Sequence, residues 1–306
     1  MKKIIINTLF TLLLITSCSV KTSTDDLTIL CPTGAPAIAF YQHSSNRHFT
    51  TNSSPATIVS SMTKNGSDII IIDTIKGIDA IKNGAPYQLA ANITFGNFYI
   101  ASTGNDDNGI MDKDDVIVNF GYGQTPQKVF ELLYGEDYTE LLYVDNVSMA
   151  AKCLQTKKTL DNSKNVDYVF IAEPALTQSL TMNLEASIYA NIQEVYQQTV
   201  NLELIQAGVF VKQTTNKKAI EEFLKNLSYD ITTLIDNPSI LDSTVTNLTN
   251  EEFTTKYGIG LPAVKNCLVN QNSIGLGFKM AKDNLQSIEE FCKLFHLNVE
   301  QNEIYQ

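Results

Sequence analysis

Two loops combine glycine with a helix start, an arrangement that suits anions and other hydrogen-bond acceptors. Residues 121–126 (GYGQTP) follow an apolar segment and precede a helical pattern. Proline stands where a dinucleotide-binding loop requires its third glycine, so the loop departs from that pattern. Glycine still permits a tight turn that presents backbone N–H groups at a helix N-terminus. Gly123, Gln124 and Thr125 are therefore candidate ligand-binding residues.

Thr33, Gly34 and Ala35 form a similar candidate site ahead of Pro36. This loop follows the first expected strand, with glycine for a close backbone approach and proline to start a helix. We expect the two loops to face each other across a cleft. Either loop taken alone is explained equally well as a good helix start.

Two carboxylates stand at the ends of apolar segments. Glu173 follows residues 168–171, at the carboxyl end of an expected strand, where α/β folds place ligand contacts. Its carboxylate can accept hydrogen bonds from a ligand amine or cap a helix that begins at Pro174, and a cap or hinge contact is slightly favoured. Asp73 and Thr74 end another apolar segment in the same way and are also candidates.

Asn97 and Phe98 complete the candidate set with an amide and an aromatic ring. Such side chains can line a cleft, although aromatic residues in strands more often pack in a core. Each candidate is, by itself, more often structural. The chain has no tryptophan, which excludes an indole ring as a stacking platform.

No constellation typical of catalysis is present in the sequence. We find no nucleophile elbow, no serine, cysteine or histidine triad, no motif with paired carboxylates and no metal-ligand cluster at convincing spacing. Three histidines in the whole chain disfavour a histidine-built metal site. We therefore predict no enzymatic activity, no cofactor and no metal. The four cysteines after position 18 are expected to be small buried residues: Cys31, Cys153, Cys267 and Cys292.

Short apolar segments that alternate with helical patterns predict an α/β fold with largely parallel strands. Strands are expected near residues 27–31, 68–73, 88–94, 97–102, 116–120, 141–144, 168–171 and 208–211. Helices are expected after Pro36, over 55–64, 77–82, 125–134 and 147–155, and over most of the chain after 211. The acidic segment 104–115 is the expected crossing between two lobes, and 208–211 the expected return. Capping-box spacing links Thr249 to Glu252 and Ser287 to Glu290.

The N-terminus has the pattern of a bacterial lipoprotein signal peptide. Lys2 and Lys3 precede an apolar run over residues 4–15, which leads into Thr-Ser-Cys at Cys18. The run is shorter than the about 20 apolar residues that a spanning helix needs. We expect cleavage after residue 17, lipidation of Cys18 with fatty acyl chains such as palmitate, and a flexible tether over 18–26.

The expected mature chain is strongly acidic. Removal of residues 1–17 takes away two lysines and no acidic residue, which leaves 20 basic and 33 acidic side chains and a formal charge of −13. Nucleic-acid binding rests on basic patches, so we expect no nucleic-acid partner.

Five segments together resemble the solute-binding lipoproteins of ABC importers, of the nitrate/sulfonate/taurine type, which have a type II periplasmic-binding-protein fold. They are the lipobox at Cys18 and residues 27–36 (LTILCPTGAP), 90–97 (AANITFGN), 123–126 (GQTP) and 167–174 (DYVFIAEP). The resemblance extends over nearly the whole expected mature chain in the same order. It implies two lobes, each a mostly parallel sheet flanked by helices: lobe 1 from residues 27–113 and 207–306, and lobe 2 from 114–206.

The resemblance also implies a mode of action. A small ligand binds between the lobes, closure buries it, and the closed form docks on ABC permease subunits in the membrane. The protein is then exported and lipid-anchored on the extracytoplasmic face of the cell membrane, and we expect it to be a monomer.

Ligand chemistry and two other functions stay open at this point. Helix N-termini suit an anion such as sulfonate, nitrate or carboxylate, whereas Glu173 and the aromatic rings suit a heteroaromatic amine. One alternative is a membrane-tethered enzyme that uses Asp73 or Glu173 as acid or base. The other is an interaction lipoprotein that has kept the fold without a solute site.

Overall fold

The computed structural model describes residues 24–306, apart from residues 107, 136, 137 and 272. The expected signal peptide, Cys18 and most of the expected tether lie outside the described residues. Thr24–Asp26, at the end of that tether, forms a 3-10 turn (η1) that contacts the long helix α8 (Lys217–Asp236). Within the described residues, no helix combines the length and apolar character that crossing a bilayer requires.

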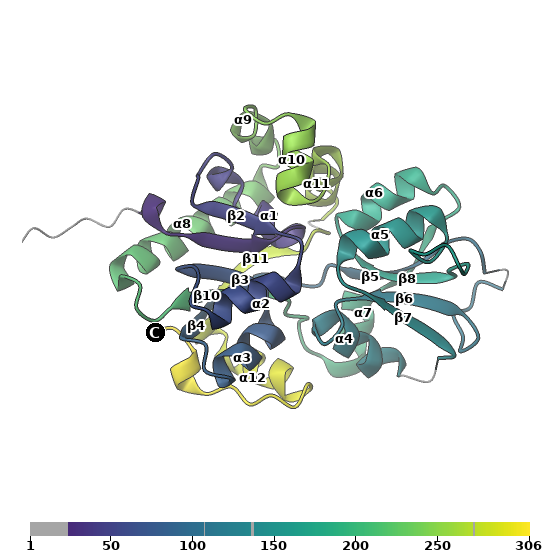
Figure 1. Ribbon diagram of the computed structural model, residues 1–306, viewed down its shortest axis with the longest axis horizontal. Helices are drawn as coiled ribbons and strands as arrows, with labels where there is room; N and C mark the ends of the chain where they lie inside the picture. Colours follow the sequence, from purple (N-terminus) through teal and green to yellow (C-terminus); the bar gives the residue numbers. More distant parts are fainter. Residues whose placement is uncertain (1–23, 107, 136–137, 272) are drawn as a thin grey trace, which may run out of the picture.

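Two mixed β-sheets form the centres of two lobes (Figure 1). The sheet of lobe 1 has the strand order β11-β4-β10-β3-β1-β2. β1, β2 and β3 are parallel neighbours, whereas β10 and β11 run antiparallel to the strands beside them. The strands are β1 (Ile29–Pro32), β2 (Phe49–Asn52), β3 (Ile69–Asp73), β4 (Tyr87–Thr94), β10 (Ala207–Lys212) and β11 (Leu276–Met280).

The sheet of lobe 2 has the order β7-β6-β8-β5-β9. β7, β6 and β8 are parallel, and β5 runs antiparallel to both of its neighbours. The strands are β5 (Phe98–Ser102), β6 (Val116–Phe120), β7 (Glu140–Val144), β8 (Tyr168–Ala172) and β9 (Ser187–Asn191). Two helix-flanked sheets confirm the predicted α/β fold class. The expectation that each sheet is mostly parallel is wrong, because β10 and β11 in lobe 1 and β5 in lobe 2 run antiparallel to every neighbour they pair with.

Helices flank both sheets (Figure 1). In lobe 2, α5 (Val147–Thr156) and α6 (Ala175–Met182) lie on one face of the sheet, and α4 (Thr125–Tyr134) and α7 (Ile192–Val200) lie on the other. Besides α8, lobe 1 has α1 (Ala35–Ile38), α2 (Pro55–Thr63), α3 (Thr74–Lys82), α9 (Ile240–Thr244), α10 (Asn250–Tyr257), α11 (Leu261–Val269) and α12 (Leu285–Lys293). Short 3-10 turns are η2 (Tyr41–His43), η3 (Ala281–Asp283) and η4 (Gln301–Glu303).

The composition of β3 explains its central place in lobe 1. Four successive isoleucines, Ile69 to Ile72, are all buried. A strand covered on both faces needs apolar side chains at successive positions rather than alternate ones. β8 is buried along its whole length for the same reason and lies in the middle of the other sheet.

Local capping signals account for several helix starts. α2 begins at Pro55, and the hydroxyl of Ser54 accepts a hydrogen bond from the N–H of Thr57 (3.3 Å). The capping box predicted between Thr249 and Glu252 is present at α10. The second predicted box is wrong: α12 begins at Leu285 with Asn284 as its N-cap residue, so Ser287 already lies inside the helix.

The chain crosses between the lobes at residues 95–97, earlier than expected. β5 pairs with β8 in the sheet of lobe 2, so lobe 1 does not extend to residue 113 and the predicted crossing at 104–115 is wrong. The chain returns through residues 201–206 to β10. The two crossings pair with each other, because Phe95 and Ile205 form a β-bridge and the N–H of Gly96 donates to the carbonyl of Leu204 (3.1 Å).

The sequence did not predict three of the strands, β2, β9 and β11. Each lies at the edge of its sheet. An edge strand has only one neighbour and needs no continuous apolar run. β7 is the exception, an edge strand that has such a run and was predicted. β2 reads FTTN and β9 is largely exposed, and neither has a pattern that distinguishes it from a loop.

α3 packs closely on β10 because Gly77 has no side chain. A Cβ atom at this position would stand 2.0 Å from Cζ of Phe210. Phe210 is fully buried in the core of lobe 1. The glycine therefore sets the distance between this helix and the sheet.

Candidate functional site

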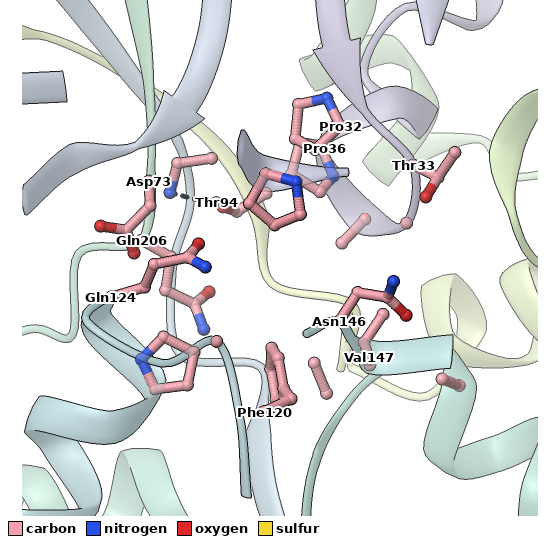
Figure 2. A pocket seen from close by; sticks show the side chains of 18 of the residues that line it. Pro32, Thr33, Pro36, Asp73, Thr94, Phe120, Gln124, Asn146, Val147 and Gln206 are labelled. Carbon is pink, nitrogen blue, oxygen red and sulfur yellow. Dashed lines mark hydrogen bonds between the residues drawn. The ribbon is translucent and has the colours of Figure 1, made fainter. Parts of the chain in front are cut away.

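A cleft between the lobes collects the carboxyl ends of strands from both sheets. Its cavity volume is about 150 Å³. In Figure 2, Asp73, Gln124 and Gln206 lie along one side of the cleft, with Asn146 and Val147 along the other. Loops and helix N-termini that follow parallel strands converge at such an edge, which is where α/β folds bind ligands.

Most of the predicted site residues line this cleft: Thr33, Gly34, Ala35, Asp73, Asn97, Phe98, Gln124 and Glu173. The two glycine-containing loops therefore meet at one cleft, from opposite lobes. The other three candidates lie behind the lining. Thr74 is buried and its hydroxyl donates to the carbonyl of Gln206, Gly123 faces Lys76, and the Thr125 side chain is fully buried.

Asp73 links the N-termini of two helices, one from each lobe. Its Oδ1 accepts the N–H of Lys76 in the first turn of α3 (3.0 Å). Its Oδ2 accepts the N–H of Thr125 at the start of α4 (3.0 Å). Burial raises the pKa of this carboxyl group, against the hydrogen bonds from Thr125 and Lys76, which lower it. A carboxylate from lobe 1 thus occupies the helix N-terminus that the sequence offered to an anionic ligand.

Glu173 caps α6, as the favoured interpretation of the sequence held. Its two carboxylate oxygens accept the N–H of Thr177 (2.9 Å) and the hydroxyl of Thr177 (2.8 Å). Only 6% of Glu173 is exposed. Burial raises the pKa of Glu173, and the bonds from Thr177 oppose that shift.

Two side-chain amides join the crossings between the lobes at the base of the cleft. Nδ2 of Asn97 donates to the carbonyls of Ile274 (3.0 Å) and Glu173 (3.3 Å). Oδ1 of Asn97 in turn accepts from Nε2 of Gln206 (2.7 Å). Sequence reasoning placed Asn97 at the site but missed Gln206, because no local pattern indicates that residue 206 returns to residue 97.

The two lobes contact each other on more than one side of the cleft. Besides the bond from Thr125 to Asp73, Nδ2 of Asn146 donates to the carbonyl of Ser53 (3.4 Å). Asn146 also caps α5, because its Oδ1 accepts the N–H of Met149 (3.1 Å). Asparagine directly before the predicted helix over 147–155 is a signal that could have indicated this cap.

Much of the remaining lining is apolar, with Asn52, Ser53, Thr94 and Asp145 as further polar residues. The apolar lining includes Ile58 and Ile72 of lobe 1 and Phe120 and Val147 of lobe 2. Phe98 packs edge-on against Phe120, with ring centroids 5.7 Å apart. The cleft therefore offers apolar walls with a few polar groups at fixed positions, the composition typical of small-molecule sites.

The described residues contain no group of three histidine, cysteine or acidic side chains that could hold a metal ion. The four cysteines expected to be buried are buried and unpaired. Cys267 contacts the residue that Glu173 binds, with its Sγ 3.4 Å from Oγ1 of Thr177. Burial, with Glu173 nearby, raises the pKa of this thiol to about 12, so it is not a nucleophile at neutral pH.

Solved structures of low sequence identity share this architecture. An ABC transporter protein from Parabacteroides distasonis has a TM-score of 0.70 at 15% identity, over 92% of this chain and 98% of that one. The periplasmic aliphatic sulphonate binding protein of Escherichia coli has a TM-score of 0.64 at 13% identity, over 92% of each chain. A Candida albicans protein with the generic periplasmic binding protein fold has a TM-score of 0.55 at 12% identity, over 90% of this chain and 92% of that one.

These likenesses show the fold: the chain has the two-lobed architecture of periplasmic binding proteins. No family model matches the sequence. No curated protein matches it either.

Proposed function

We propose that the chain is the extracytoplasmic solute-binding lipoprotein of an ABC importer. The observation that carries the proposal is the cleft itself, whose lining comes from the carboxyl ends of strands in both lobes. The fold shared with a sulphonate-binding protein and an ABC transporter protein supports it.

The contacts between the lobes explain how binding is coupled to shape. A ligand in the cleft touches both lobes only when they are closed, so it stabilises the closed state by its differential affinity for that state. The hydrogen bonds that Asp73 and Asn146 make between the lobes also form only when the lobes are close together. The closed form is then the one that a membrane permease recognises.

The signal-peptide pattern at the N-terminus indicates where the protein is located. Lipid on Cys18 holds the body at the extracytoplasmic face of the membrane, as a monomer beside the permease subunits. The carboxylates that an enzyme would use as acid or base, Asp73 and Glu173, both hydrogen-bond to helix N-termini. This favours binding without turnover.

A screen of solutes against the full-length chain tests the proposal. Sulfonates, nitrate, heteroaromatic amines, flavins and amino acids are added singly, and the melting temperature and the X-ray scattering profile are recorded. A true ligand at about 100 times its Kd stabilises the protein by about 2.7 kcal/mol and reduces the radius of gyration. It is recovered chemically unchanged.

A matched pair of variants tests whether the solute binds in the cleft. Gln124→Ala changes the cleft, whereas Gln286→Ala makes the same change at an exposed position on α12. We expect Gln124→Ala alone to weaken the stabilisation. If no solute stabilises the protein or changes its scattering, or if the ligand is consumed, the transport-binding proposal is wrong.

A further inference from the structure

The charged side chains that line the cleft are all acidic. They are Asp73, Asp145 and Glu173, and among the described residues neither lysine nor arginine lines the cavity. The ammonium group of Lys76 lies behind Gly123, and the N–H of Lys76 already donates to Asp73. An anion in this cleft would meet carboxylates without a balancing cation on the wall.

Four helix N-termini at the cleft are already used by the chain's own side chains, whereas the one-turn helix α1 after Gly34 has no side-chain cap. Asp73 accepts the N–H of Thr125 at α4, and Glu173 accepts that of Thr177 at α6. Ser54 and Asn146 do the same at α2 and α5. An N-terminus whose N–H group is hydrogen-bonded to a carboxylate has lost much of its attraction for a second anion.

Proline removes further donors from the same helices. Pro55 and Pro126 stand in the first turns of α2 and α4, and Pro174 is the N-cap residue of α6. Proline has no backbone N–H, and its ring presents an apolar face instead. All three prolines line the cleft. The first turns of these helices therefore contribute apolar surface to the cleft rather than N–H donors for an anion.

One buried acceptor in the lining lacks a partner. Oε1 of Gln206 has no hydrogen bond within the described residues, although only 6% of Gln206 is exposed. Its orientation follows from its neighbour: Nδ2 of Asn97 donates to two carbonyls, so Oδ1 of Asn97 must face Gln206 and accept from Nε2. Oε1 of Gln206 is then the atom left without a donor, and a buried acceptor without one is costly.

The size of the cavity limits the ligand. Its volume of about 150 Å³ matches that of an engineered apolar cavity that holds one benzene molecule. Its walls at Ile58, Phe120 and Val147 suit the faces of a flat ring. A ligand that fits this cavity is thus about one ring in size.

We propose that the cleft binds a single-ring molecule with an amino or amidinium-type nitrogen and rejects anions. This proposal rests on the proposed function. Asp73 is the residue that determines this specificity. A carboxylate can accept about four hydrogen bonds, and Asp73 has two within the chain, so it has capacity for a ligand N–H. Oε1 of Gln206 is a second acceptor for that ligand.

Four probes of one size and different charge test the proposal by calorimetry on the full-length chain at neutral pH. They are benzamidine (cationic), benzamide (neutral), benzoate and benzenesulfonate (both anionic). We expect benzamidine and benzamide to bind more tightly than either anion. If benzoate or benzenesulfonate binds most tightly, the proposal on ligand class is wrong, while solute binding in the cleft stands.

Failure of all four probes to bind also overturns the single-ring proposal. The broader solute screen, which includes larger and multi-ring compounds, then decides the proposed function separately. Binding of a larger ligand with closure in that screen retains the function and rejects the ligand class.

Variants of the acidic residues sharpen the test. Asp73→Asn removes the charge and keeps the shape, and we expect the preference for benzamidine over benzenesulfonate to fall by about tenfold or more. Asp79→Asn, on the exposed side of the same helix, is the control and should leave the preference unchanged. An unchanged preference in Asp73→Asn contradicts the specificity role.

Asp145→Asn covers the case in which Asp73→Asn does not fold. Asp145 is exposed at the edge of the cleft, so its replacement is not expected to affect folding. We expect benzamidine to bind several-fold more weakly because one attractive charge is lost. Glu222→Gln, with the same charge change on the exposed face of α8, should have no effect. Equal affinities in Asp145→Asn and wild type would count against the charge argument.

Discussion

Two of the three carboxylates that line the cleft, those of Asp73 and Glu173, have a raised pKa in the folded protein. Both lie among apolar neighbours, and burial is the main cause of the raised pKa of Asp73 and of Glu173. Their hydrogen bonds to helix N–H groups offset only part of that effect. The same residues that hold helix ends and lobes together therefore make stability depend on pH.

The variant Glu173→Gln isolates this dependence. A group whose folded-state pKa is raised contributes stability that is complete below its unfolded pKa and is lost as the pH rises through the folded-state value. The ordinary pKa of glutamate is near 4.5. Since the substituted glutamine side chain does not ionise and can still accept from Thr177, we expect the variant's melting temperature to gain on wild type as the pH rises from about 4 to about 7.

Thermal unfolding at a series of pH values measures the effect. Glu222→Gln, the same change at an exposed position on α8, is the control and should track wild type throughout. A difference between Glu173→Gln and wild type that is the same at every pH would show that the ionisation of Glu173 does not affect stability.

The sequence located some site residues and missed others for a physical reason. Asp73 and Glu173 follow apolar runs directly, so the rule on carboxyl ends of strands points to them. Gln206 follows no such run, and its partner Asn97 is far away in the chain. A contact between two distant segments has no local signature, and the same holds for the bond between Asp73 and Thr125.

At the level of elements, the close packing of α3 on β10 depends on one missing side chain. Gly77→Ala would normally favour a helix by about 1 kcal/mol. Here the new Cβ would stand 2.0 Å from Cζ of Phe210. We expect the overpacking to dominate and to lower the free energy of unfolding by about 1–3 kcal/mol in urea denaturation.

A double mutant identifies the cause. Phe210→Leu removes the ring that the new methyl group meets, so Gly77→Ala should be less destabilising in the Phe210→Leu background than in wild type. Equal effects in the two backgrounds would mean that the ring is not the obstacle and that the helix itself requires glycine.

Buried strands were predicted well, whereas three of the four edge strands, all but β7, were missed. β3, β6 and β8 have apolar runs, and each was predicted within two residues of its bounds. The assignment of β5 to lobe 1 failed for a different reason. β4 and β5 are consecutive strands separated by three residues, 95–97, which suits a hairpin as well as a crossing. Only pairing with β8 shows that the chain has left the first sheet.

For the whole molecule, the proposed lipid anchor should affect location and not affinity. Cys18 lies outside the described residues, and the cleft is built entirely from residues 32–259. Cys18→Ser should therefore release the protein from the membrane fraction and impair uptake of its solute, while calorimetry on the released protein gives an unchanged Kd. Tethering raises effective concentration near the permease without adding a contact to the ligand.

Cys31→Ser is the control for that prediction. Cys31 is buried in β1, so the change is expected to affect stability and to leave the protein in the membrane fraction. Retention of Cys18→Ser in the membrane fraction, or a weakened affinity in the released protein, would contradict the role of Cys18.

The pairing of the two crossings has a consequence for how the molecule folds. Lobe 2 is one continuous segment, from β5 to α7, inserted between β4 and β10, which are neighbours in the other sheet. It can complete its five strands from one continuous segment, whereas lobe 1 needs β10, α8 and β11, which all follow lobe 2 in the chain. Contacts between distant segments form slowly, so a lobe made from one continuous segment is expected to fold before one that needs distant segments. The second lobe is thus the natural first folding unit, and in pulse-labelled hydrogen exchange its amides should become protected before those of β1 and β3.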